Sequence, residues 1–276
     1  MHSLSRADVL PLTCTREGVC CHGHQIWINP WELARLAAVA NLSRAEFRAR
    51  HTDCRGTRLL FNGPVGWRGK PACSLYDAQR GCTAHSGRPL TCRMYPLGRA
   101  RHEGAVVYYH PGERLSCLDM CPSVTSLPSQ SVGQYLEGQD IANGEIATDA
   151  YANLVYGMVG VVKSLCDHGP TAGVDVVAVH QSFDDLVAMT PEERTALLPD
   201  EWVDLLTLLP PNLPLDSPAI AVQRHGEHLN SLVQAQMNLT GASLTDVANL
   251  YLAMAFHLNA TIGGDTSAMR GLLIPA

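Results

Sequence analysis

The segment CSLYDAQRGCTAHSGRPLTCRMYP, residues 73–96, decides the fold of the N-terminal half of the chain. Its three cysteines, Cys73, Cys82 and Cys92, are separated by eight and nine residues. The glycine before Cys82 and the Gly-Arg-Pro run before Cys92 predict turns on either side of a loop. Such a loop brings Cys82 and Cys92 near each other without a regular element, so we expect this half to be irregular.

The other cysteines are concentrated in the same half. Nine of the ten lie within the first 121 residues, and only Cys166 lies beyond them. The N-terminus lacks the apolar run of a secretory signal, so we expect a cytoplasmic protein whose thiols stay reduced. Metal binding is then a better interpretation than structural disulfides. The nine cysteines are Cys14, Cys20, Cys21, Cys54, Cys73, Cys82, Cys92, Cys117 and Cys121.

Charge is divided in the same way. The first 121 residues hold 16 Lys and Arg against 9 Asp and Glu, whereas the rest of the chain holds 4 against 17. The net charge of −6 excludes a globally basic nucleic-acid binder. No apolar run approaches the roughly 18 residues of a membrane-spanning helix. We therefore expect a cysteine-cluster metal-binding region over residues 1–125 and a helical region over residues 126–276.

The predicted fold class is mostly α, with an irregular cysteine-rich N-terminal region and a C-terminal bundle of roughly five or six helices. Several helix starts carry a Ser, Thr or Asn cap, with Pro in the first turn or an acid three residues on. The β-prone residues 105–110 favour a short strand pair. Helices are predicted to begin at or near Asn29, Ser43, Ser131, Glu145, Thr190, Ser217 and Ser243.

Cysteine spacing bears on the identity of the metal. Structural zinc sites usually contain two cysteines about two to four residues apart, and only Cys117 and Cys121 have that spacing. The side chains of the adjacent Cys20 and Cys21 diverge in extended backbone, which suits a polynuclear centre, two centres, or one ligand beside one structural thiol. Iron is therefore favoured, in a mononuclear or polynuclear site or an iron–sulfur cluster, and zinc is the alternative.

Other polar residues are candidates for a place at this centre. Arg88 and Arg93 flank Cys92, and we expect both to contact the centre, because guanidinium groups lower thiol pKa values and donate hydrogen bonds to sulfur. A solvated basic face is the alternative. His85, His22 and His24 are weaker candidates for ligands. In the second half, His225 and His228 are spaced to share a ligand, but core or surface roles are the better interpretation.

These segments together resemble the CxxCxxCC family of YkgJ-like zinc- or iron-chelating proteins. The stretch CTREGVCC, residues 14–21, resembles the opening signature of the family. Residues 82–96 resemble its block G-C-x-I-[YH]-x-x-R-P-x-x-C-R-x-[FY]-P. The segments that begin at Ile28 and Ser43 resemble its first two helices, and the similarity extends over residues 10–160. A related cysteine motif occurs in flagellin lysine N-methylases.

The resemblance implies one shared metal centre in the N-terminal half. One departure from the family pattern is Glu17, which stands where the family has its second cysteine. Glu17 is either a hard ligand or a solvent-facing residue of a site with one ligand fewer. The candidate metal ligands are Cys14, Cys20, Cys21, Cys73, Cys82, Cys92, Cys117 and Cys121.

Three classes of function fit this pattern. The first is an iron or iron–sulfur protein whose centre is functional as well as structural. The second is a binding module in which a structural zinc ion cross-links the N-terminal half and the helices bind a protein or peptide. The third is a carrier or sensor that exchanges metal ions. The resemblance also allows a protein-modifying enzyme of the lysine N-methylase kind, although no glycine-rich strand–turn–helix pattern for S-adenosylmethionine is present, so enzymatic activity is left open.

Overall fold

The computed structural model describes residues 2–10, 18–102, 105–110 and 129–273. The chain divides into two compact units. We call Met1–Ile26 together with Leu59–Glu145 the cysteine unit, and Trp27–Arg58 together with Ile146–Ala276 the helical unit. The predicted mostly α fold is confirmed. The segment 27–58 belongs to the same unit as the C-terminal helices. The division expected from the sequence, into 1–125 and 126–276, had assigned this segment to the N-terminal region.

The cysteine unit consists of short strands, 3-10 turns and small helices. Its longest described helical segment apart from the start of α7 has seven residues. The elements are β1 (His2–Leu4), β2 (Val9–Leu10), η1 (Val19–Cys21), η3 (Trp67–Gly69), β5 (Tyr76–Asp77), β6 (Gly81–Cys82), η4 (His85–Gly87), α3 (Leu90–Met94), β7 (Gly98–His102), β8 (Ala105–His110), β9 (Gln130–Ser131) and α6 (Val132–Gly138). The strand β4 (Arg58–Leu59) lies at the border of the two units.

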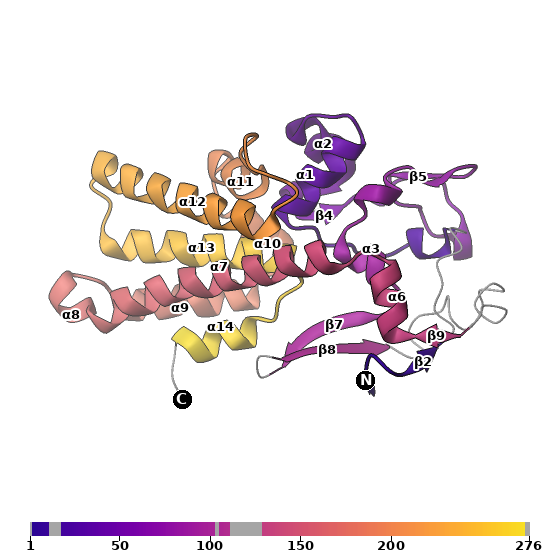
Figure 1. Cartoon of the computed structure of the whole chain (residues 1–276). Coiled ribbons are helices and arrows are strands. Elements are labelled where there is room, and N and C mark those ends of the chain that lie inside the picture. Colours follow the sequence, from indigo (N-terminus) through magenta and orange to yellow (C-terminus); the bar gives the residue numbers. More distant parts are fainter. Residues whose placement is uncertain (1, 11–17, 103–104, 111–128, 274–276) are drawn as a thin grey trace. The chain divides into compact units, whose positions relative to one another are not determined.

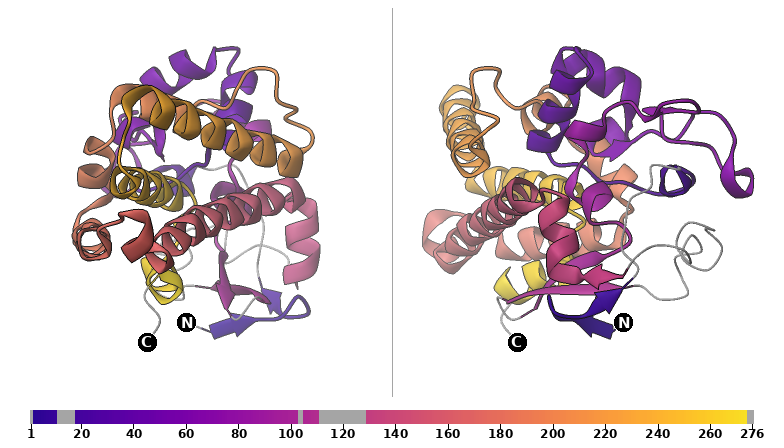
Figure 2. Two further views of the ribbon diagram at one scale, coloured as in Figure 1. Left: turned by 90° about the vertical axis from the view of Figure 1, so that its left-hand side faces the viewer. Right: turned by 45° about the vertical axis from the view of Figure 1, so that its right-hand side comes forward.

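A small antiparallel sheet organises one part of the cysteine unit. The strand pair expected at 105–110 is present as the β7–β8 hairpin, and β1 adds to the other side of β8 (Figure 2). The sheet lies beside a small apolar core that includes Leu90 of α3, Tyr108 of β8 and Tyr135 of α6. Helix α6 begins with the expected capping box, in which Ser131 and Gln134 satisfy each other's backbone N–H groups.

The helical unit carries most of the long helices, as Figure 1 shows. Its elements are α1 (Pro30–Val39), α2 (Arg44–His51), β3 (Thr52–Asp53), η2 (Cys54–Gly56), most of α7 (Ala142–Asp167), α8 (Gly169–Ala172), α9 (Val176–Ala188), α10 (Pro191–Ala196), α11 (Asp200–Thr207), α12 (Pro218–Thr240), α13 (Leu244–Thr261) and α14 (Thr266–Leu273). One continuous core is formed by side chains from these helices, among them Trp31, Tyr151, Phe183 and Phe256.

The capping signals located several helices correctly. Capping boxes start α1 at Asn29, α2 at Ser43, α10 at Thr190 and α13 at Ser243, as expected. The expected number of helices in the second half was too low, because the short α8 and the helices α9, α11 and α14 were not predicted. Helix α11 follows Pro199 without a side-chain cap, so no capping signal marks its start. Within the described ranges, no helix combines the length and apolarity needed to cross a lipid bilayer.

Candidate metal centre

The adjacent cysteines Cys20 and Cys21 lie in the 3-10 turn η1. The turn follows Gly18, whose φ of 77° lies in the left-handed region. The Gly18 carbonyl accepts hydrogen bonds from the Cys21 N–H and from Nδ1 of His22, both at 2.8 Å. A Cβ at Gly18 would overlap the ring of Tyr76, so only glycine allows this approach. Local backbone geometry therefore fixes the position of both cysteines.

Cys73 is held beside this turn by the backbone. Its N–H donates to the carbonyl of Cys21 at 2.7 Å. The residues that follow Cys21 also pair with the residues that precede Cys73. His22 and Ala72 form an antiparallel bridge, and the N–H of Gly23 donates to the carbonyl of Pro71 at 3.0 Å. Two segments that are far apart in sequence therefore meet at these cysteines, and Cys73 is buried at the crossing.

Cys82 is positioned by a tight hairpin. Strands β5 and β6 pair Tyr76 with Cys82 and Asp77 with Gly81. The Asp77 carboxylate accepts from the N–H groups of the turn at 2.9 and 2.8 Å, and Gly81 has a φ of 73°. The Tyr76 ring meets the ring of His22 edge-on at a centroid distance of 5.0 Å. The hairpin is thereby tied to the segment that carries the adjacent cysteines.

Cys92 lies on the short helix α3. Hydrogen bonds from Arg88 and Arg93 hold the loop before this helix and join it to Gln139. The buried guanidinium of Arg93 donates to the carbonyls of Arg88 at 2.9 Å, Gln139 at 2.8 Å and Ser86 at 2.5 Å. Arg88 donates to the His85 carbonyl and to the side-chain oxygen of Gln139 at 3.0 Å. Through these hydrogen bonds, Arg93 fixes the conformation of the loop before α3 and links this loop to the end of α6.

The thiols of five cysteines lie near enough to affect one another's ionisation. A hydrogen bond from Cys21 lowers the pKa of Cys20 to about 7, with a further contribution from the charge of Arg88. The pKa of Cys21 is raised by that hydrogen bond, by burial, and by the charges of Cys20, Cys92 and Cys82. Cys20 and Cys21 therefore share a single proton readily.

The thiols of Cys73 and Cys92 favour the protonated form in the absence of a metal. Burial, with the charge of Cys82, raises the pKa of Cys73 to about 11. Burial also raises the pKa of Cys92, as do the charges of Cys73, Cys20 and Cys82, whereas Arg88 opposes this shift. Because like charges crowd together, these thiols can ionise jointly only when a cation compensates them.

This donor set fits a thiolate-bound metal. The thiolate is the form that binds metals, and a bound cation replaces the protons of the thiols. Within the described part of the chain, however, no three His, Cys, Asp or Glu side chains already have an arrangement that holds a metal ion. Cys14, Cys117, Cys121 and Glu17 lie outside the described residues. The full ligand set therefore remains a prediction.

Two further cysteines lie elsewhere, in the helical unit. The Cys54 thiol donates to the Glu192 carboxylate at 3.2 Å, and burial together with this hydrogen bond raises the Cys54 pKa to about 12. Cys166 lies on α7 and packs against the helical core. Both cysteines have surroundings that suit structural thiols.

The histidine candidates have hydrogen bonds and ring contacts in the structure. The ring nitrogens of His225 lie 3.1 Å from the hydroxyl of Tyr151 and 2.8 Å from the Leu205 carbonyl, so both are occupied and His225 is a core residue. His22 is bonded to its own turn, and His24 stacks edge-on with Tyr95 at 5.7 Å.

Sequence reasoning did not identify the role of Gln139. Its side chain binds Arg88 and its carbonyl binds Arg93, so one residue joins both arginines to α6. No spacing or motif connects Gln139 with the cysteine segments, because the contact is made only in the folded chain.

Residues 13–111 match the model of the CxxCxxCC family, which is described as a putative zinc- or iron-chelating domain. The matched range contains six of the eight predicted cysteine ligands, and Cys117 and Cys121 lie beyond it. No curated protein and no solved structure gives a significant match to the chain. Over residues 13–111 the chain is therefore similar to the zinc- or iron-chelating domains that the CxxCxxCC model describes.

Proposed function

We propose that the cysteine unit chelates iron through Cys20, Cys21, Cys73, Cys82 and Cys92, and that the centre is functional as well as structural. The observation that carries this proposal is that the cysteine segments meet: the N–H of Cys73 donates to the Cys21 carbonyl at 2.7 Å, and Tyr76, which pairs with Cys82, contacts the ring of His22 at a centroid distance of 5.0 Å. The directions of the thiol pKa shifts agree with this arrangement. Cys14, Cys117 and Cys121 are further candidate ligands. The proposal places the protein in the reducing cytoplasm, where such thiols stay available.

Cysteine spacing favours iron over zinc. Structural zinc sites usually contain two cysteines about two to four residues apart, and among the candidate ligands only Cys117 and Cys121 have that spacing. The other candidates suit an iron or iron–sulfur centre held by cysteine thiolates. The charge of Arg88 acts on both Cys20 and Cys92, as expected of a residue that tunes such a centre.

Metal analysis tests the proposal. The protein is purified without oxygen, and its iron, zinc and sulfide contents are measured together with its visible and Mössbauer spectra. We expect stoichiometric iron and a coloured protein. Cys82→Ser and Cys92→Ser should each lose most of the metal, whereas the control variants Cys54→Ser and Cys166→Ser should keep it. Equal metal contents in all four variants would contradict the proposed ligand set.

The influence of Arg88 on the centre is tested by replacing it. Replacing Arg88 with Gln removes a positive charge from the centre, so the reduction potential of bound iron should become more negative. Arg80→Gln is the matched control, because Arg80 is exposed on the β5–β6 turn. An unchanged potential in Arg88→Gln would contradict the proposed tuning of the centre by Arg88.

The alternative is a zinc-stapled module that binds a protein or peptide. Its support is the scarcity of regular structure between residues 59 and 89, where the described elements are two-residue strands and single turns. Such a segment gains much stability from one cross-linking ion. A colourless protein with stoichiometric zinc and no iron would favour this alternative.

A further inference from the structure

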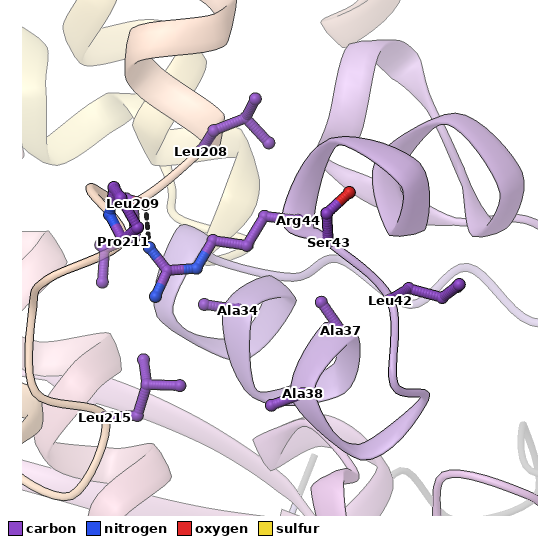
Figure 3. Close-up of a pocket in the computed structure, with 10 residues that line it drawn as sticks. All are labelled: Ala34, Ala37, Ala38, Leu42, Ser43, Arg44, Leu208, Leu209, Pro211 and Leu215. Carbon is purple, nitrogen blue, oxygen red and sulfur yellow. Dashed lines mark hydrogen bonds between the residues drawn. The ribbon is translucent and has the colours of Figure 1, made fainter.

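A pocket of about 410 Å³ lies within the helical unit (Figure 3). Three alanines of α1 line one side, and Leu208, Leu209, Pro211 and Leu215 from the segment after α11 line the other. The volume lies within the range of about 300–1,000 Å³ that is typical of small-molecule sites. Because nearly all lining side chains are apolar, a ligand here needs an apolar body.

Only two lining side chains are polar, and one of them is already occupied. The Ser43 hydroxyl donates to the Glu46 carboxylate at 2.8 Å and accepts from the Glu46 N–H at 3.2 Å in the capping box of α2. Arg44, the next residue, extends across the pocket toward Leu209 (Figure 3). Arg44 is therefore the group that remains to recognise a ligand.

The guanidinium of Arg44 keeps donors for a ligand. One of its nitrogens donates to the Leu209 carbonyl, but a guanidinium carries five N–H groups. Arg48 and Arg50 on the same helix pair with Asp204 and Glu46. Among the described residues, Arg44 makes no such ion pair. Burial lowers the pKa of Arg44, which shows that its charge is partly removed from water.

We propose that this pocket binds a small aliphatic carboxylate. The carboxylate would accept two parallel hydrogen bonds from Arg44, the geometry for which a guanidinium is suited. The hydrocarbon chain would lie between the alanines of α1 and the leucines opposite. A partly buried cation without a carboxylate is costly, and this ligand supplies both the missing charge and the apolar contact.

Matched probes test the proposal on the full-length, metal-loaded protein. Decanoate, decanol and decylamine share one chain and differ only at the head group, and their binding is measured by calorimetry. We expect decanoate to bind at least about tenfold more tightly than decanol, and decylamine to bind least. Arg44→Gln should remove the preference for decanoate over decanol. Arg50→Gln, on the same helix but away from the pocket, should leave all three affinities unchanged.

A second variant keeps the test valid if Arg44→Gln fails to fold. Ala38 lines the pocket and is exposed, so Ala38→Leu fills space without disturbing the core. It should weaken decanoate binding by about tenfold while Arg44 stays in place. Equal binding of decanoate and decanol, or no decanoate binding at all, would overturn the proposal. So would tighter binding of a peptide ending in leucine, or dimerisation that Ala38→Leu abolishes, because either result assigns the pocket to a different occupant.

Discussion

The helical unit and the cysteine unit achieve stability in different ways. In the helical unit, helices far apart in sequence bury large side chains such as Tyr151, Phe183 and Trp202 in one core. In the cysteine unit, a smaller core lies around α3 and α6, and the segment 59–89 is joined by turns and isolated hydrogen bonds. The difference shows why the cysteines lie where they do. A segment that buries little apolar surface cannot by itself offset its loss of conformational entropy. We propose that a bound metal supplies the missing stability.

The largest expected effect follows from removal of a proposed ligand. Cys92→Ser should lose the metal, and with it the metal-dependent part of the stability of the cysteine unit, which is about 10 kcal/mol for structural zinc sites. Limited digestion with trypsin should then cut after Arg68 and Arg80, each of which is followed by a glycine. The bond after Arg224 in α12 should stay protected, because that helix belongs to the core of the other unit.

Two other digestion patterns would change the comparison. Cys166→Ser is the matched control and should be digested like the parent protein. If Cys92→Ser is also digested like the parent, the metal does not stabilise the cysteine unit. If the whole chain is digested uniformly, the two units unfold as one cooperative system.

The second prediction weakens the helical unit alone. Phe256 is fully buried on α13 and packs edge-on against Phe183 at 5.3 Å. Phe256→Ala should lower the free energy of unfolding by about 4 kcal/mol, because it leaves a cavity in a close-packed core. Urea unfolding followed by the helical circular dichroism signal measures the loss. Metal content should be unchanged, and a loss of metal would contradict independent stability of the two units. Leu239→Ala is the control, because Leu239 is 86% exposed.

The third prediction concerns acid. Burial lowers the pKa of His225 to about 4 and that of His257 to about 3. The unfolded chain binds these protons near pH 6.5 and the folded chain does not, so the stability is complete above pH 6.5 and is lost as the pH falls toward 4. Each histidine should cost about 2 kcal/mol between pH 7.5 and pH 5.

Urea unfolding at the two pH values, monitored on the helices, measures this loss. His257→Leu should show about half the dependence on pH, since only His225 then remains. A free energy of unfolding that does not change between pH 7.5 and pH 5 would mean that the two histidines are not held neutral in the core.

The smallest expected effect compares the same motif in both units. Ser131 caps α6 in the cysteine unit and Ser243 caps α13 in the helical unit, each within a capping box. Either serine replaced by alanine should cost about 1 kcal/mol. In Ser131→Ala the loss should appear in the metal-free protein as easier proteolysis of the cysteine unit. A much larger loss in one unit would show that its cap also supports tertiary contacts.

Sequence patterns that lie within one helical turn were sufficient to predict where several helices begin. Asn29, Ser43, Thr190 and Ser243 predicted helix starts because the cap and its partner lie three residues apart. Helix α11 has no such cap. It is stabilised by contacts with α1 and α13, which are distant in sequence and therefore left no local signal.

The sequence by itself determined which residues could chelate a metal. It identified the clustered cysteines, the turns around Cys82 and the family resemblance, because these depend on residue type and short spacing. Only the tertiary structure decided how the segments meet. The hydrogen bond from Cys73 to Cys21 and the arginine contacts with Gln139 join distant parts of the chain. The grouping of segment 27–58 with the C-terminal helices was decided in the same way, because burial of an apolar helix face depends on which partner the whole fold presents.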